Sequence, residues 1–131
     1  MAIANLAAAG KLSYLEDIYL GKNQIKDEGV EAFAQNVDKL SHLRDIGLSQ
    51  NQITDRGLKA LTAGKLSHLR AISLWDNQIE GKGFEALATV ANNLSCLKSI
   101  DLASNNITGE GLTAIFKNAD KMSSLKIIEL S

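Results

Sequence analysis

Residues 40–53 read LSHLRDIGLSQNQI, and residues 66–79 read LSHLRAISLWDNQI. The chain of 131 residues therefore carries nearly the same fourteen letters twice. Related strings begin at positions 12, 94 and 122, so the five starting points lie 28, 26, 28 and 28 residues apart. Every copy has leucine at its fourth and ninth positions and isoleucine at its seventh, and the first four copies have asparagine at the twelfth. A period in this range predicts a solenoid, because one such unit cannot bury its apolar face without a neighbour.

Each copy contains two periodicities. Ile46 and Leu48 alternate with polar or small residues, which predicts a short strand, and the same pair recurs in the other copies. After the asparagine, apolar residues recur at steps of three and four, which predicts a helix with one buried face. The residues of that face are Val30, Phe33, Val37 and Leu40, then Phe84, Leu87, Ala91 and Leu94, then Leu112, Ile115, Ala119 and Met122. The 26-residue interval predicts a helix shorter by about half a turn between Leu58 and Leu66.

The helix starts are also marked in the sequence. Asp27 and Asp55 each stand two residues before a glycine, and Gly81 and Gly109 occupy the same place in the later copies. Aspartate is a strong N-cap and glycine is an acceptable one, so these four residues are predicted to cap the helices.

Composition limits the classes of function. The net charge of −1 argues against a nucleic-acid partner, which usually needs a basic surface, and against attraction to an anionic membrane. No stretch approaches the roughly 18 apolar residues of a membrane span. The single cysteine, Cys96, excludes an internal disulfide framework and favours a reducing, cytoplasmic location.

The residues that could carry chemistry follow the repeat itself. His42, His68 and Cys96 hold the same place in successive copies, and a metal ion accepts such ligands. The repeat alone explains this spacing, and the next copy places Ser124 where a fourth ligand would stand. We therefore predict no metal and no cofactor. No nucleophile with a base and an oxyanion-stabilising loop can be recognised, so we predict that the chain is not an enzyme. The competing hypothesis, a small metal-dependent enzyme, is supported only by the two histidines and the cysteine.

The pattern L-x-x-L-x-x-I-x-L-x-x-N-x-I, followed by x-D/G-x-G-[VLF]-x-A-[FLI], resembles the leucine-rich repeat of the long, ribonuclease-inhibitor-like subtype. That subtype also builds the sensing ends of NOD-like receptors and the Ran GTPase-activating proteins. The resemblance implies an α/β fold, a right-handed horseshoe with a parallel sheet on the concave side and helices on the convex side. It implies one domain over residues 1–131, with a partial helix in 1–11, repeats starting at 12, 40, 66 and 94, and a final strand from 122. The asparagines are then expected to point inward and bond the bend after each strand (Asn23, Asn51, Asn77 and Asn105).

The resemblance also places the side chains beside each strand's isoleucine and leucine on the concave face. A basic row at the strand starts and an acidic patch beside it are expected there. Trp75, the only tryptophan, stands where the other copies have small residues, so its indole is expected to be largely exposed on the rim. The candidate partner-binding residues are Tyr19, Arg44, Arg70, Trp75, Asp76, Asp101 and Glu129.

These features predict a module that recognises a protein partner through its concave face, as part of a larger sensor, adaptor or effector. The alternative is a regulator of an enzyme, either a GTPase activator or an enzyme inhibitor. Neither end of the sequence has the polar cap that solenoids normally need. We therefore expect either a longer array or self-association through the uncapped ends.

Overall fold

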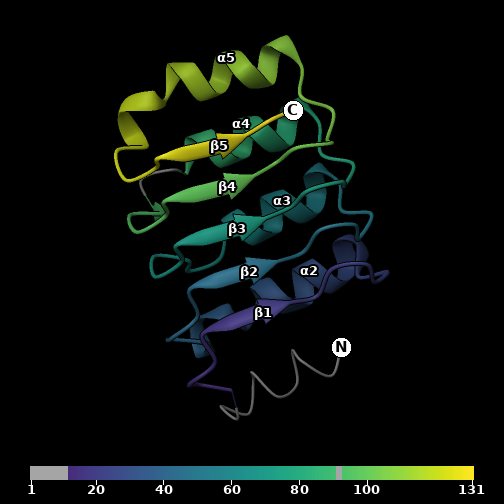
Figure 1. The fold of residues 1–131 in the computed structure, drawn as a ribbon, viewed down its shortest axis with the longest axis vertical. Helices are drawn as coiled ribbons and strands as arrows, with labels where there is room; N and C mark the ends of the chain where they lie inside the picture. The colour runs from purple at the N-terminus through teal and green to yellow at the C-terminus, as the bar shows by residue number, and fades with distance from the viewer. Residues whose placement is uncertain (1–11, 91–92) are drawn as a thin grey trace.

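The computed structural model describes residues 12–90 and 93–131. Five short strands form one parallel sheet in chain order, in which equivalent residues of successive copies lie side by side (Figure 1). The strands are β1 (Asp17–Tyr19), β2 (Asp45–Gly47), β3 (Ala71–Ser73), β4 (Ser99–Asp101) and β5 (Ile127–Glu129). The predicted α/β solenoid is therefore confirmed.

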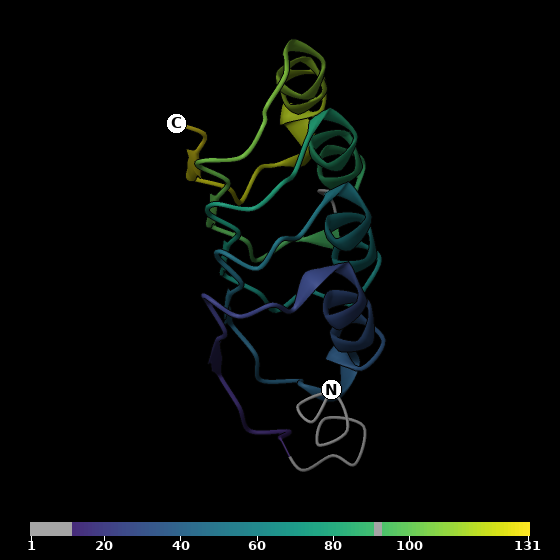
Figure 2. The ribbon, with the colours of Figure 1, turned by 90° about the vertical axis from the view of Figure 1, so that its right-hand side faces the viewer.

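The helices cover one side of the sheet and leave the other side open, as Figure 2 shows. They are α2 (Lys26–Ala34), α3 (Asp55–Thr62), α4 (Gly81–Thr89) and α5 (Gly109–Lys117), with 3₁₀ turns η1 (Val37–Lys39) and η3 (Ala119–Lys121). The α-helices end earlier than the apolar pattern predicts, because Val37 and Ala119 belong to 3₁₀ turns instead. The expected helix in 1–11, and Ala91 of the predicted helical face, lie outside the described residues.

The 26-residue interval between the second and third copies shortens the helical segment that precedes β3, as predicted. Helix α3 has 8 residues where the other three have 9. No 3₁₀ turn follows α3 before β3, whereas η1 follows α2. A surface hollow of about 180 Å³ lies at this place, between residues 37–43 and 65–69.

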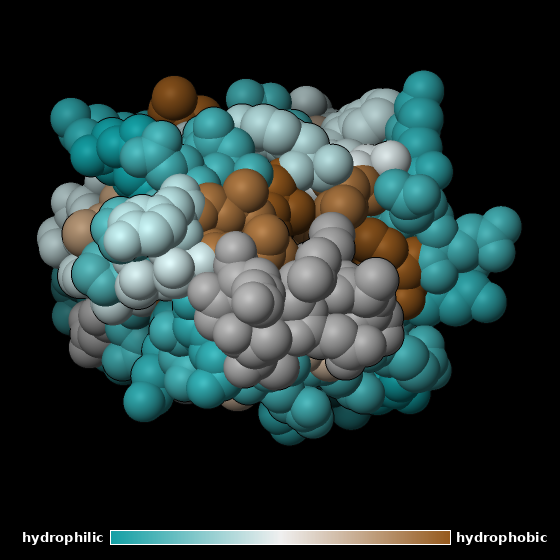
Figure 3. Space-filling view, turned by 90° about the horizontal axis from the view of Figure 1, so that it is seen from below, coloured by the Kyte–Doolittle hydropathy of each residue, from teal (hydrophilic) through white to brown (hydrophobic). Residues whose placement is uncertain are grey.

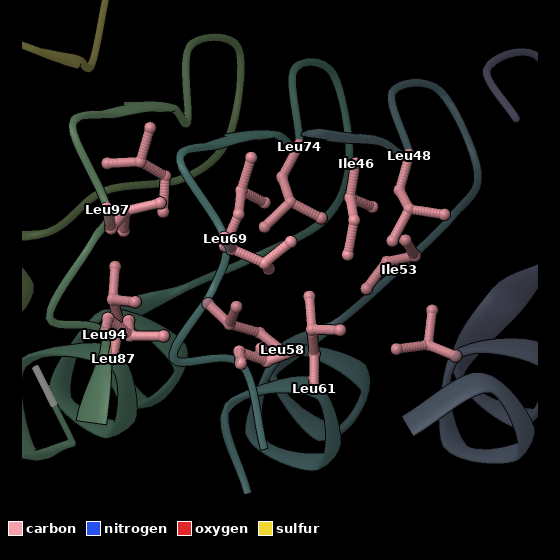
Figure 4. Packing of buried hydrophobic residues seen from close by; sticks show 14 of the residues in the cluster. Ile46, Leu48, Ile53, Leu58, Leu61, Leu69, Leu74, Leu87, Leu94 and Leu97 are labelled. Atoms are coloured by element: carbon pink, nitrogen blue, oxygen red, sulfur yellow. The ribbon is translucent and has the colours of Figure 1, made fainter. Parts of the chain in front are cut away.

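The core lies between the sheet and the helices (Figure 4). Each strand contributes its central isoleucine, and each helix contributes an apolar stripe. Ile46, Leu58 and Phe84 are at most 2% exposed, so successive copies share one continuous hydrophobic layer. Such burial stabilises by roughly 25 cal/mol per Å² of apolar surface, and supplies the main driving force for the fold.

The asparagine ladder is confirmed. The Asn77 amide donates to the carbonyls of Leu48 (3.1 Å) and Leu74 (3.0 Å), and its Oδ1 accepts from the backbone N–H groups of Asn51 and Ile53, both at 3.0 Å. One copy earlier, the Asn51 amide donates to the carbonyls of Leu20 and Ser49, and its Oδ1 accepts from the backbone N–H groups of Asn23 and Ile25. Because each amide side chain bonds backbone of its own copy and of its neighbour, the ladder joins the copies as well as shaping the bend.

The predicted helix caps are wrong. Helix α3 is capped by Thr54, whose hydroxyl accepts from the N–H of Arg56, and α5 is capped by Thr108 in the same way. Helix α4 follows Glu80, and α2 follows Ile25, without a side-chain cap. The predicted residues Asp27, Asp55, Gly81 and Gly109 lie inside the first turns.

The two aspartates instead bond the start of the next helix. Asp27, which is 9% exposed, accepts through Oδ1 from the N–H groups of Thr54 (2.8 Å) and Gly57 (3.0 Å). Asp55 accepts from the N–H of Glu80 at 2.6 Å. A Cβ on Gly57 would lie 2.5 Å from Asp27 Oδ1, so glycine makes room for the carboxylate of the preceding copy. The aspartate and glycine of the D-x-G pattern are therefore explained by a contact between copies, in which the aspartate of one copy lies against the glycine of the next.

The ends of the solenoid keep apolar surface. Leu112 of α5 is 39% exposed, whereas Leu58 and Phe84, at the same repeat position, are covered by the following helix. Phe116 of α5 and Ile127 of β5 are also exposed. Figure 3 looks at the opposite end, near β1, and shows hydrophobic surface there among hydrophilic residues.

Candidate functional site on the sheet face

The open side of the sheet, here called the sheet face, carries the side chains on either side of each buried isoleucine. One column consists of the first strand residues, Asp17, Asp45, Ala71, Ser99 and Ile127, and a second of the third strand residues, Tyr19, Gly47, Ser73, Asp101 and Glu129. A shallow hollow of about 150 Å³ lies over these two columns. The backbone pairing fixes the columns in register, so the face is a preformed surface.

Tyr19 lies at the β1 end of this face and is 69% exposed. Its ring covers Gly47, because a Cβ on that glycine would lie 2.7 Å from Tyr19 Cδ1. The hydroxyl donates to Asp45 Oδ2 at 3.4 Å. Partial desolvation, the charges of Asp17 and Asp45 and this hydrogen bond together raise the pKa of Tyr19 above its ordinary value. Glycine at position 47 thus allows the ring to lie across the neighbouring strand.

Sequence reasoning missed the column of Asp17 and Asp45 as part of the site. Together with Asp101 and Glu129, these residues give the two columns four carboxylates and no basic side chain. We call these four residues the acidic strip. The alternation of side chains across a strand could have identified it, because residues two apart share a face.

The predicted basic row is in register along one margin of the face. It consists of Arg44, Arg70, Lys98 and Lys126, each directly before a strand. Backbone bonds run along it: the N–H of Arg70 donates to the carbonyl of Arg44 at 2.7 Å, and the N–H of Lys98 to that of Arg70 at 2.8 Å. Arg44 pairs with Glu16 at 3.6 Å, an exposed contact that contributes little to stability.

Trp75 and Asp76 lie beyond the opposite ends of the strands. Trp75 is 39% exposed and belongs to the exposed large apolar side chains, as expected, although part of the residue is covered. Asp76 has a left-handed backbone, with φ of 55°, as have Lys22, Gln50 and Ser104 at the same repeat position. Its Oδ2 accepts from Gln50 Nε2 at 3.0 Å, which links two neighbouring bends. The predicted site residues therefore occupy one face, but Trp75 and Asp76 form a separate edge of it.

His42, one of the residues considered above as metal ligands, contacts residues of the preceding copy. The His42 ring lies 5.4 Å from the Tyr14 ring, centroid to centroid, and its Nδ1 is 2.8 Å from the carbonyl oxygen of Ser13. Among residues 12–90 and 93–131, no three His, Cys, Asp or Glu side chains gather closely enough to hold a metal ion. Within the same residues, no helix has the length and apolar character needed to cross a membrane.

Comparison with known proteins identifies the family. A leucine-rich-repeat profile matches residues 11–34, 39–61, 65–88 and 93–116, which together make up most of the chain. The chain therefore belongs to the leucine-rich-repeat family. A search of the curated proteins found no match.

Solved structures share the fold at low sequence identity. The chain is similar to actin-binding site 2 of leiomodin-1, with a TM-score of 0.82 and 15% identity over 98% of this chain and 76% of that one. It is also similar to the C-terminal domain of tropomodulin from Caenorhabditis elegans, with a TM-score of 0.76 and 14% identity over 99% and 81% of the two chains. An internalin from Listeria monocytogenes gives a TM-score of 0.51 and 22% identity over 95% and 37%.

Proposed function

We propose that residues 1–131 form a single recognition domain that binds a protein partner through the sheet face and catalyses no reaction. We place it in the cytoplasm, as a segment of a larger sensor, adaptor or effector. The observation that carries this proposal is the contrast between the two sides of each strand. The central strand residue is isoleucine in all five copies and is buried in the first four, whereas the third strand residue is a different amino acid in each copy. The fold requires the first pattern but not the second.

The solved neighbours support the class of function. The leiomodin-1 domain is described as an actin-binding site, so this architecture can present a protein-binding surface. At 15% identity the likeness concerns the fold alone, and actin is not carried over to this chain.

Affinity capture from a lysate with matched variants tests the proposal. Arg70→Glu with Asp101→Lys reverses two charges on the sheet face and leaves the net charge unchanged. Lys82→Glu with Glu85→Lys makes the same exchange on exposed residues of α4. We expect the first variant to lose the partners that the wild type retains, and the second to keep them. Loss from the α4 variant alone would place binding on the helical side.

The alternative function, regulation of an enzyme, uses the same surface. A captured enzyme whose turnover changes when the chain is added would support a GTPase activator or an inhibitor. A captured partner with no change in activity would favour the sensor or adaptor function.

We further propose that the chain self-associates through its exposed end. In the described residues β5 pairs only with β4, and Ile127 of β5 and Phe116 of α5 are both largely exposed. An unpaired edge with apolar neighbours favours pairing with another chain. Light scattering should show a mass that rises with concentration, and Ile127→Lys with Phe116→Glu should reduce the rise. A constant monomer mass for the wild type would contradict the proposal.

A further inference from the structure

Within the described residues, most charged side chains of the sheet face form no ion pair. On the helical side, Arg56 pairs with Glu28 at 2.9 Å and with Glu31 at 2.7 Å. On the sheet face, Arg44–Glu16 is the one ion pair formed by the described residues. The other three members of the basic row, and all four carboxylates of the acidic strip, form no ion pair there. Two bands of opposite charge are thus left open to a partner: the basic row, and the acidic strip, which runs from the first residues of β1 and β2 to the third residues of β4 and β5.

The spacing of the bands decides what kind of partner element they fit. Neighbouring strands lie about 4.8 Å apart, so three steps from β2 to β5 cover about 14 Å. Three turns of an α-helix cover about 16 Å. Three same-face steps of an extended chain cover about 20 Å, which misses by more than one strand. Side chains on one face of a helix therefore stay closer to register with the bands.

The width of the face agrees with the same element. From the basic row to the third strand residue is three residues, or about 10 Å, close to the 10–12 Å diameter of a helix with its side chains. Between the bands the side chains are small: Ala71, Ser73 and Ser99 line the hollow. Tyr19 covers Gly47 at one end and so bounds the surface at β1.

On the basis of the proposed function, we infer that the sheet face receives an α-helix of the partner, lying across the strands. One stripe of this helix is acidic and lies over the basic row, and the neighbouring stripe is basic and lies over the acidic strip. Charge complementarity of this kind selects the partner and accelerates its association. The two stripes also fix the direction of the helix, since turning it end for end exchanges their sides.

Three synthetic peptides test this inference by calorimetric titration. The first is an alanine-based helix of about 18 residues, with glutamates along one stripe and lysines along the next. The second has the same composition with the two charges mixed within each stripe. The third is the first peptide with two central alanines replaced by proline, which breaks the helix. We expect the first to bind with a Kd at least about tenfold lower than either of the others, and to weaken as salt is raised.

Variants of the chain then test direction and surface together. Arg70→Glu with Lys98→Glu, which reverses the middle of the basic row, should weaken the first peptide by about tenfold or more. Adding Asp101→Lys and Glu129→Lys should regain part of the lost binding, because a helix turned end for end then meets complementary charge over β4, where both bands are reversed. Thermal melts confirm that each variant is folded.

Equal binding by the proline peptide or by the mixed-stripe peptide would overturn the inference, as would a fourfold variant that fails to regain binding. Binding by none of the peptides would also overturn it. If the sheet-face variant still loses the captured partner in that case, the recognition function stands and only the helix assignment fails. If partner capture does not depend on the sheet face, the proposed function itself fails.

Discussion

Replacing Asn77 by alanine should remove a buried member of the asparagine ladder. Asn77 is 8% exposed, and its amide side chain bonds four backbone groups, three in the preceding copy and one in its own. Alanine cannot replace any of these bonds. The N–H groups of Asn51 and Ile53 then lose the oxygen that accepts from both.

The loss of stability depends on which backbone groups are left without a hydrogen-bond partner. The carbonyl of Leu74 still accepts from the Asn105 amide at 2.9 Å, so it keeps a hydrogen bond. The N–H groups of Asn51 and Ile53 and the carbonyl of Leu48 lose their side-chain partner. An orphaned buried group costs about 1–3 kcal/mol, so three groups cost at least about 3 kcal/mol. For a domain of this size, that lowers Tm by about 10 °C.

Asn23→Ala is the matched control, because Asn23 holds the same repeat position at the exposed end of the ladder. Its amide donates to the carbonyls of Leu20 (2.9 Å) and Gly21 (3.2 Å), and water can replace both bonds. Thermal unfolding followed by circular dichroism should therefore show a loss for Asn23→Ala of less than half that for Asn77→Ala. Equal losses, or no loss at position 77, would refute the reasoning that the ladder holds buried backbone groups.

Three further predictions concern other parts of the chain. Gly57→Ala should destabilise the fold by about 2 kcal/mol, because its Cβ would meet the Asp27 carboxylate of the preceding copy. Gly109→Ala should not destabilise the fold, because its Cβ would meet nothing within 4 Å. Equal unfolding curves for the two variants would contradict this prediction. In a Tyr14→Phe variant, absorbance titration should show Tyr19 ionising above pH 10.0. The contribution of the neutral phenol to stability should disappear as the pH rises through that raised pKa. A midpoint at or below pH 10.0 would contradict the claim that the nearby carboxylates raise the pKa of Tyr19. Trp75→Ala should lower Tm by less than Asn77→Ala and weaken binding of the captured partner by about 2 kcal/mol, measured by titration, and unchanged affinity would place the docking surface elsewhere.

The sequence was sufficient to predict the repeat, the parallel strands, the asparagine ladder and the shorter α3. These features depend on identical residues at identical intervals, and a solenoid converts such intervals directly into neighbouring positions in space. The apolar periodicity overestimated the helices, because Val37 stays buried in a 3₁₀ turn as well as it would in an α-helix. Burial alone does not distinguish the two.

The helix caps were predicted wrongly because the partner of each aspartate lies in the next copy. Asp27 fits the spacing of a cap in its own helix, but its carboxylate bonds Thr54 and Gly57, 27 and 30 residues further on. A pattern within one copy contains no information about that contact. The only sign of this contact in the sequence is the glycine of the next copy. It can be recognised only when two neighbouring copies are aligned and compared.

The candidate site was predicted in part. The repeat placed Tyr19, Asp101 and Glu129 in one column and Arg44 and Arg70 in another, and the strand register agrees with both. The exposed fraction of Trp75, 39%, could not be predicted from its repeat position, because that position carries a small residue in the other copies.

Photo-crosslinking at single positions tests the central proposal most directly. A photoreactive amino acid is placed at Ala71 or Ser99, which line the hollow of the sheet face, and in parallel at Lys59 or Lys82 on α3 and α4. If the sheet face binds the partner, irradiation of the complex should join the partner to the first pair of positions and not to the second. Crosslinks from Lys59 and Lys82, with none from Ala71 and Ser99, would contradict recognition through the sheet face.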